Sequence, residues 1–199
     1  MIKTIIFDLG GVILKNAMRK INTLIAQELG LDRDYVISEV RKINPPLHKG
    51  KMSEEEFYKK FAEVLKTSPE FIKNYYTKEF EKYTGFNDDV VEIVKELKKK
   101  FILAVLSNTY EYHAKLNEKD PRFRLFDLII FSHRVGMRKP DREIYEHILK
   151  RLNIKPDECI FIDDLPKNVE AAKNMGIKGI LFQNAEQLKE DLKKLGVDV

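Results

Sequence analysis

Polar residues of three kinds follow the apolar runs of this sequence: carboxylates, a hydroxyl beside an amide, and an ammonium. In chain order they are Asp8, Ser107, Asn108, Lys139, Asp163 and Asp164. Carboxylates held close together repel one another unless a proton or a hard cation lies between them, and Mg²⁺ is the usual cation of phosphate sites. A lysine and a hydroxyl nearby would bind the oxygens of an anion. This combination fits phosphoryl transfer through an aspartyl-phosphate.

The apolar runs that precede these residues are predicted to be buried parallel strands, because they are short and continuous. They are TIIFDL from Thr4, FILAVL from Phe101, LIIF from Leu128, CIFIDD from Cys159 and GILF from Gly179. Helices are expected at residues 88–100, 141–152, 168–175 and 185–195. Alternating strands and helices predict an α/β fold with a doubly wound parallel sheet. Its polar groups would gather at the C-terminal ends of the strands.

Residues 15–84 break this alternation, because they show helical periodicity and contain no strand-like run. Helices are expected at residues 17–29, 34–43, 53–65 and 69–83, and Ser53 with Glu56 forms a capping box. The segment NPPLHKGKMS, residues 44–53, is expected to be the main irregular loop. We therefore predict a core of residues 1–14 and 85–199. A small helical bundle, residues 15–84, would be inserted as a cap over the sheet edge that carries Asp8.

The composition restricts the class of protein. The 199 residues carry a formal net charge of +4, but acids and bases are interleaved, which favours solvated helix faces over a nucleic-acid interface. The one cysteine, Cys159, excludes an internal disulfide and a thiolate metal site. No apolar stretch has the length of a membrane span, and no signal peptide is recognisable. We expect a cytoplasmic protein without a membrane partner, either a monomer or a homodimer.

Four stretches resemble, in order, the motifs of the haloacid dehalogenase-like (HAD) hydrolase superfamily. They are FDLGGVIL, LSNT, GMRKPDREIY and FIDDLPKNVEAAKNMGI, and together they span nearly the whole chain. The resemblance implies a Rossmann-like core with a C1-type cap, similar to glucose-1-phosphatases and to the N-terminal phosphatase of epoxide hydrolases. It also implies Mg²⁺ as cofactor. The reaction implied is hydrolysis of a small phosphorylated metabolite, with sugar phosphates as one class, through an aspartyl-phosphate.

The same resemblance implies a role for each motif residue. Asp8 would be the nucleophile and a metal ligand, and Gly10 would give its backbone carbonyl to the metal. Asp164 aligns with the direct metal ligand, which leaves Asp163 as its supporting partner. Lys139 would neutralise charge and orient Asp8. The phosphoryl oxygens would be held by Ser107, the Asn108 amide and Lys139.

One position departs from the pattern of the superfamily. Most of its phosphatases carry an Asp two residues after the nucleophile, which protonates the leaving alcohol and later activates water, but here that residue is Gly10. The reaction could proceed without this acid in three ways. The leaving group could depart unprotonated, water or the substrate could relay the proton, or the cap could supply an acid. His48 in the LHKGK loop is the candidate for both this role and substrate binding, because imidazole titrates near neutrality.

Two other functions stay open at this point. In a haloacid dehalogenase the aspartate attacks carbon and needs no metal, but such enzymes carry an aromatic residue at the position of Gly10 and lack the acid pair. A non-catalytic phosphate-binding or regulatory protein would keep the metal and phosphate site and lose turnover together with the missing acid. The cap cations Arg19, Lys49 and Lys51 are expected to be solvated rather than to bind an anion.

Overall fold

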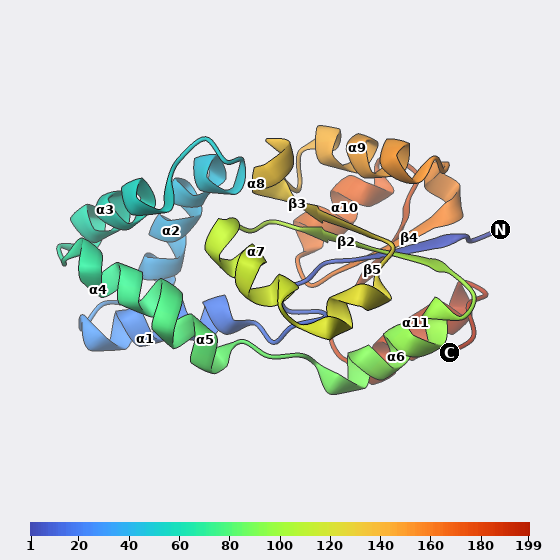
Figure 1. The fold of residues 1–199 in the computed structure, drawn as a ribbon, viewed down its shortest axis with the longest axis horizontal. Coiled ribbons are helices and arrows are strands. Elements are labelled where there is room, and N and C mark those ends of the chain that lie inside the picture. The colour runs from blue at the N-terminus through green and yellow to red at the C-terminus, as the bar shows by residue number, and fades with distance from the viewer.

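Five parallel strands form one sheet through the centre of the molecule (Figure 1). The computed structural model describes residues 1–199. The strands are β1 (Thr4–Phe7), β2 (Ile102–Ser107), β3 (Leu128–Phe131), β4 (Cys159–Asp163) and β5 (Lys178–Leu181). They lie in the order β3-β2-β1-β4-β5, and each neighbouring pair is parallel. The five strands and the doubly wound α/β class are therefore confirmed.

Helices cover both faces of this sheet, which explains why the strands are continuously apolar. They are α6 (Asp88–Lys98), α7 (Glu111–Glu118), α8 (Ser132–Val135), α9 (Arg142–Leu152), α10 (Pro166–Lys173) and α11 (Ala185–Lys194), with 3-10 turns η2 (Pro121–Leu125) and η3 (Pro156–Glu158). Ile5 and Phe7 of β1 belong to the hydrophobic cluster under α6 and α11, whereas Ile6 belongs to the cluster under α9 and α10. Successive side chains of the strand thus enter opposite cores.

The remaining helices, called here the inserted helices (residues 17–83), lie beyond the C-terminal ends of the strands (Figure 1). They are α1 (Ala17–Glu28), α2 (Arg33–His48), α3 (Glu54–Leu65), α4 (Pro69–Asn74), a π-helical turn η1 (Tyr75–Glu79) and α5 (Phe80–Tyr83). They share a hydrophobic cluster, joined by Tyr110 from outside these helices, in which Phe57 and Tyr76 are almost completely buried. None of these or the other helices combines the length and the apolar composition of a membrane span.

Two details of the prediction were wrong. Residues 44–48 were expected in a loop, but α2 continues through Pro45 and Pro46 to His48. Proline lacks an N–H group and disfavours a helix interior. The buried Leu47, which packs in the cluster of the inserted helices, favours the continuation. Helix α7 was not predicted, because its buried face consists of His113, Ala114 and Asn117 and so carries little hydrophobic periodicity.

Candidate active site

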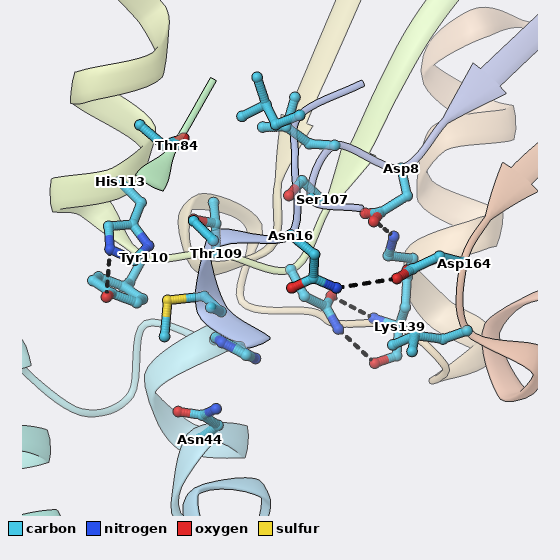
Figure 2. Close-up of a pocket in the computed structure, with 18 of the residues that line it drawn as sticks. Asp8, Asn16, Asn44, Thr84, Ser107, Thr109, Tyr110, His113, Lys139 and Asp164 are labelled. Atoms are coloured by element: carbon cyan, nitrogen blue, oxygen red, sulfur yellow. Dashed lines mark hydrogen bonds and ion pairs between the residues drawn. The ribbon is translucent and has the colours of Figure 1, made fainter. Parts of the chain in front are cut away.

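The order of the strands brings the predicted polar residues to one edge of the sheet. Asp8 directly follows β1, at the centre of the sheet, and Ser107 and Asp163 end the two strands that flank β1. The Asp8 N–H donates to the carbonyl of Ile162 at 2.8 Å, so Asp8 and Asp163 lie level across the ladder. A cavity of about 330 Å³ opens here between the strand ends and the inserted helices (Figure 2).

Lys139 joins the acids of the two central strands. Its Nζ lies 2.5 Å from Asp8 Oδ1 and 2.7 Å from Asp163 Oδ2, and the lysine is 1% exposed. Burial alone would lower the pKa of Lys139, but Asp163 and Asp8 raise it above its ordinary value, so the side chain is an ammonium. Burial raises the pKa of Asp8 to about 7, opposed by Lys139 and reinforced by Asp163. The nucleophile predicted from sequence therefore lies in a cluster with excess negative charge.

Asp163 and Asp164 differ in how many of their oxygens are already engaged. Asp163 Oδ1 accepts hydrogen bonds from the N–H of Leu165 and from Asn168 Nδ2, both at 2.9 Å, while its Oδ2 accepts from Lys139. Asp164 accepts from Asn16 Nδ2 at 3.3 Å, and it lines the cavity (Figure 2). Asp164 therefore retains oxygen lone pairs for a ligand, whereas Asp163 is held in place by protein donors.

The arrangement of the acids fits a divalent cation. One oxygen each from Asp8, Asp163 and Asp164 lie within 4.8 Å of one another. Burial, followed by the charge of Asp163, raises the pKa of Asp164 above its ordinary value, so the repulsion between the acids is not fully neutralised by Lys139. All available donors are oxygens, the set that Mg²⁺ prefers.

The loop after β1 places Gly10 at the cavity and Gly11 against Asp164. The loop is closed by hydrogen bonds from the N–H of Gly11 to the carbonyl of Leu14 at 2.7 Å and from the N–H of Leu14 to the carbonyl of Leu9 at 2.8 Å. A Cβ atom on Gly10 would meet nothing within 4 Å. Gly11 has φ +92°, and a Cβ there would lie 2.8 Å from Asp164 Cγ. Gly10 therefore borders open space, whereas the absence of a side chain at Gly11 lets the loop backbone approach the Asp164 carboxylate closely.

Ser107 and Asn108 take different positions at the end of β2. Ser107 is 3% exposed and lines the cavity. Asn108 turns its side chain to the peptide group of Lys139: its Oδ1 accepts from the Lys139 N–H at 2.9 Å, and its Nδ2 donates to the Lys139 carbonyl at 2.8 Å. The Asn108 side chain is thus engaged in fixing the lysine, which leaves its backbone N–H to contact a ligand.

Two histidines line the cavity, one from α2 and one from α7. His48 lies in the last turn of α2, and burial together with the charge of Arg138 lowers its pKa to about 3, so it is uncharged at neutral pH without a ligand. His113 of α7 stacks on Phe80, with ring centroids 3.5 Å apart. Its Nε2 lies 2.7 Å from the Tyr110 hydroxyl and 3.0 Å from the Tyr76 carbonyl. His113 therefore joins α7 to the inserted helices.

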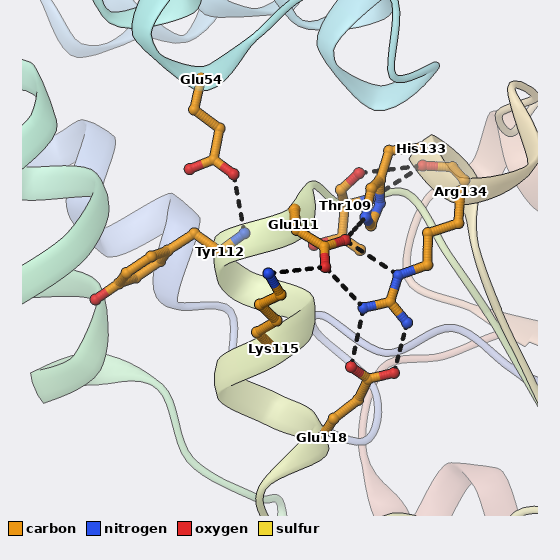
Figure 3. A network of polar contacts seen from close by, with 9 residues as sticks. Glu54, Thr109, Glu111, Tyr112, Lys115, Glu118, His133 and Arg134 are labelled. Carbon is orange, nitrogen blue, oxygen red and sulfur yellow. Dashed lines mark hydrogen bonds and ion pairs between the residues drawn. The ribbon is translucent and has the colours of Figure 1, made fainter.

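Further polar contacts fix the inserted helices and the segment that leads to Lys139. Glu54 of α3 accepts from the Tyr112 N–H at 2.9 Å (Figure 3). Glu111 of α7 contacts both His133 and Arg134, at 2.7 Å from His133 Nε2 and 3.1 Å from Arg134 Nε (Figure 3). These residues hold α8, just before the loop of Lys139.

Of the cap cations, Lys49 pairs with Asp141 at 2.6 Å, and neither Lys51 nor Arg19 lines the cavity.

Several cavity residues were not singled out from the sequence. They include Asn16, Arg41, Asn44, Arg138, Lys167 and Asn168. Arg138, Lys167 and Asn168 lie inside the motifs quoted above, next to Lys139 and Asp164, so their positions could have been inferred. Arg41 and Asn44 give no such signal, because they reach the cavity only through the course of α2.

Comparisons with known proteins agree with this geometry. The family model of haloacid dehalogenase-like hydrolases matches residues 2–176. D-ribitol-5-phosphate phosphatase of Bacteroides thetaiotaomicron is 27% identical over 209 residues, which cover 96% of this chain and 97% of that protein. Bifunctional epoxide hydrolase 2 of Rattus norvegicus is 26% identical over 214 residues, which cover 95% of this chain and 38% of the relative. The chain thus spans well under half the length of this and other curated relatives.

A solved structure gives the same result for the fold. A HAD family enzyme from Bacteroides thetaiotaomicron, in complex with magnesium and inorganic phosphate, superposes with a TM-score of 0.70 at 23% identity, covering 92% of this chain and 96% of that chain. This likeness shows a shared fold. Because the family match covers most of the sequence, and the four motifs meet at one edge of the sheet, the chain belongs to the haloacid dehalogenase-like hydrolase family.

Proposed function

We propose that the protein is a Mg²⁺-dependent phosphatase that hydrolyses a small phosphorylated metabolite through an aspartyl-phosphate on Asp8. The observation that carries this proposal is the cluster at the strand ends. The carboxylates of Asp8, Asp163 and Asp164 share one site, and the Lys139 ammonium lies 2.5 Å from Asp8. The names of the relatives support it, since one is a sugar-alcohol phosphate phosphatase and one solved neighbour holds magnesium and inorganic phosphate.

Three residues would hold the metal in this proposal, and a fourth would support them. Asp8 and Asp164 would bind it through carboxylate oxygens and Gly10 through its backbone carbonyl, while Asp163 would hold Lys139 and support the site. When bound, Mg²⁺ would neutralise the acids and the phosphoryl oxygens and so lower the barrier to attack by an anion on an anion.

The residues of the chain would then divide the reaction between them. Asp8 attacks phosphorus, the bond from phosphorus to the leaving oxygen breaks, and that oxygen takes a proton from solvent or from the substrate. Lys139 lowers the pKa of Asp8 against the effect of burial and holds its carboxylate in place, because its ammonium is within hydrogen-bond distance. The Ser107 hydroxyl and the Asn108 N–H donate to the phosphoryl oxygens. Water then attacks phosphorus of the aspartyl-phosphate, releases inorganic phosphate and restores the Asp8 carboxylate.

The inserted helices would act as the cap of this enzyme. We assign residues 15–84 to the cap and residues 1–14 and 85–199 to the core, since most of the buried residues of the inserted helices form one hydrophobic cluster to which the core adds only Tyr110 among the buried members. The cap contributes Asn22, Arg41, Asn44 and His48 to the cavity wall, and its volume of about 330 Å³ suits a small metabolite. Contacts from the cap would therefore select the substrate.

The test is phosphate release from p-nitrophenyl phosphate and a panel of sugar phosphates, with Mg²⁺ and with a chelator. We expect release only with Mg²⁺, and a loss of roughly a thousandfold or more in Asp8→Asn, because an amide is a poor nucleophile. Asp89→Asn, at an exposed position of α6, is the matched control and should behave as wild type. Full activity in Asp8→Asn, or release that ignores Mg²⁺, would overturn the mechanism. No release by folded, Mg²⁺-binding protein would favour a non-catalytic phosphate-binding protein.

A further inference from the structure

Four cations line the cavity without an ion-pair partner. They are Lys15 of the loop after β1, Arg41 of α2, Arg138 of the loop before Lys139, and Lys167 of α10. Their neighbours differ in this respect, because Lys139 pairs with Asp8 and Asp163, and Lys49 pairs with Asp141. Arg41, Arg138 and Lys167 belong together among these four, because Arg138 and Arg41 both lower the pKa of Lys167. Asp141 acts on the pKa of Arg138 and Asp163 on that of Lys167, but neither acid forms an ion pair with these cations.

The position of Arg41 follows from the helix that carries it. Arg41, Asn44 and His48 are spaced i, i+3 and i+7 along α2, so they share one face of the helix, and all three line the cavity. Figure 2 shows Asn44 on the α2 side of the cavity, away from Asp8 and Asp164. Arg138 and Lys167 approach the same space from the core. A ligand group held here would therefore touch both parts of the molecule.

Buried polar atoms around these cations lack a partner within the protein. They are Arg138 Nε, His48 Nδ1 and Asn44 Oδ1. A buried donor or acceptor without a partner destabilises the protein. A ligand that supplies the missing hydrogen bond removes this cost. Because the Arg138 Nε–H is a charged donor, the group that satisfies it best is an anionic oxygen.

The pKa of Lys167 responds more to the neighbouring cations than to the acids around Asp8. Burial, then Arg138 and Arg41, lowers this pKa, opposed by Asp163, and burial with Arg138 as the next cause lowers that of His48. The pKa of Asp8 responds instead to burial, Lys139, Asp163 and Asp164. A cation whose pKa is lowered by neighbouring positive charges marks a place where an added negative charge is favourable.

We propose that Arg41, Arg138 and Lys167 bind a second anionic group of the substrate, either a carboxylate or a second phosphate. The inference rests on the proposed phosphatase function and names its substrate class: phosphorylated acids or bisphosphates, rather than neutral sugar monophosphates. Two guanidinium groups and an ammonium provide more donors than a hydroxylated body needs, and guanidinium matches carboxylate and phosphate geometry. The second anion lies between α2 and the core while the scissile phosphoryl group lies at Asp8.

The experiment compares substrates that differ by one anionic group. Glycerol 1-phosphate is matched with 3-phosphoglycerate, and fructose 1-phosphate with fructose 1,6-bisphosphate. We expect kcat/KM of wild type to be roughly tenfold or more higher for the doubly anionic member of at least one pair, chiefly through KM. The preferred pair identifies the second group as carboxylate or phosphate.

The variants assign this preference to the cations. Arg41→Gln should bring the ratio within each pair close to one, and Arg41→Lys should retain part of it. Arg41 is exposed on α2, so its replacement leaves the packing intact, which circular dichroism checks. Lys42→Gln removes the same charge from the adjacent, exposed position outside the cavity and should keep the wild-type ratio. A wild-type ratio near one, or an equal loss in Lys42→Gln, would overturn the inference.

Binding measured without turnover separates this inference from the proposed function. The same compounds titrated into Asp8→Asn in the presence of Mg²⁺ give dissociation constants by calorimetry. Tighter binding of the doubly anionic compounds, lost when Arg41→Gln is added, supports the second anion site even where no phosphate is released. Hydrolysis of p-nitrophenyl phosphate with equal binding of both members of each pair leaves the phosphatase function standing and refutes the second anion site.

Discussion

The side chain of Asn108 forms two hydrogen bonds with the peptide group of Lys139, one to its N–H and one to its carbonyl. Asn108 follows β2, whereas Lys139 lies on the loop after β3 and α8, 31 residues further along the chain. This amide pairing fixes the backbone of Lys139 while its ammonium reaches Asp8 and Asp163. The lysine is thus held at both ends, which is the condition for aiming the Asp8 carboxylate.

Asn108→Ala removes both of these bonds and leaves the Lys139 peptide group without its partners. We expect the free energy of unfolding to fall by about 2 kcal/mol, and kcat to fall by roughly tenfold or more, because Lys139 no longer holds Asp8. Urea unfolding and steady-state hydrolysis of p-nitrophenyl phosphate measure the two effects. Asn174→Ala, at an exposed position after α10, is the matched control. A destabilised Asn108→Ala protein with wild-type kcat would show that the pairing serves stability alone.

Gly11 is predicted to control the position of Asp164. In Gly11→Ala, the new methyl group would lie 2.8 Å from Asp164 Cγ at φ +92°, so the loop or the carboxylate must move. We expect the Mg²⁺ concentration for half-maximal activity to rise roughly tenfold or more, since one ligand is displaced. Calorimetric titration of Mg²⁺ gives the same affinity without turnover. Gly10→Ala, whose Cβ meets nothing within 4 Å, is the control and should bind Mg²⁺ as wild type does. Equal affinities in both variants would contradict the prediction.

The core of the fold was predictable from sequence because its signals are local. Ile5, Ile6 and Phe7 are buried on both faces of the sheet, and a strand in that environment has to be continuously apolar. The end of α2 was not predictable in this way. Pro45 and Pro46 disfavour a helix locally, and only packing of the inserted helices against residues such as Leu47 shows why the helix continues.

Some residues of the candidate site were likewise predictable from the sequence and others were not. Asp8, Ser107 and Asp163 end neighbouring strands, so the topology alone brings them together once the sheet order is known. Arg41 and Asn44 belong to a helix far from these motifs in the chain, and their place in the cavity depends on the continuation and docking of α2. The sequence of a surface helix does not show where the helix docks or which of its polar residues reach a cavity.

The buried His113 should make stability depend on pH. Burial lowers its pKa to about 3, opposed by its hydrogen bond with the Tyr76 carbonyl, whereas the unfolded chain has the ordinary value of 6.5. Between these values the unfolded state binds a proton that the folded state does not, so stability falls as pH decreases below about 6.5. The loss for one such group approaches about 1.4 kcal/mol per pH unit. Urea unfolding at pH 7.5, 6.0 and 5.0 measures it.

The contribution of His113 is isolated by removing its titration. His113→Gln keeps a polar side chain near the Tyr110 hydroxyl and the Tyr76 carbonyl but binds no proton in this range. We expect a lower stability at pH 7.5, because the stacking on Phe80 is lost, together with a shallower decrease between pH 7.5 and 5.0. His48, whose pKa is also lowered, contributes equally to both proteins and cancels from the comparison. Identical slopes would mean that His113 takes up a proton within the folded protein.

The last prediction concerns the proton donor that Gly10 lacks. Without that donor, the leaving oxygen departs as an anion, so we expect wild-type rates to fall steeply as the pKa of the leaving alcohol rises. In Gly10→Asp the new side chain enters open space at the cavity, two residues after Asp8. A positioned general acid contributes roughly a hundredfold or more, and its effect is largest for poor leaving groups. Alkyl phosphates should therefore gain about a hundredfold in kcat, while p-nitrophenyl phosphate changes little.

Gly10→Asn distinguishes proton donation from a change of shape, because its side chain has the same size and carries no acid. If Gly10→Asp and Gly10→Asn behave alike, the gain is steric and the missing acid is not the limitation. If wild type already hydrolyses aryl and alkyl phosphates at equal chemical rates, a donor is present elsewhere. His48 is then the residue to replace, because a bound phosphate would raise its depressed pKa toward neutrality. His48→Gln would lower the rate for alkyl phosphates selectively, and Gly10→Asp would restore that rate in the same protein.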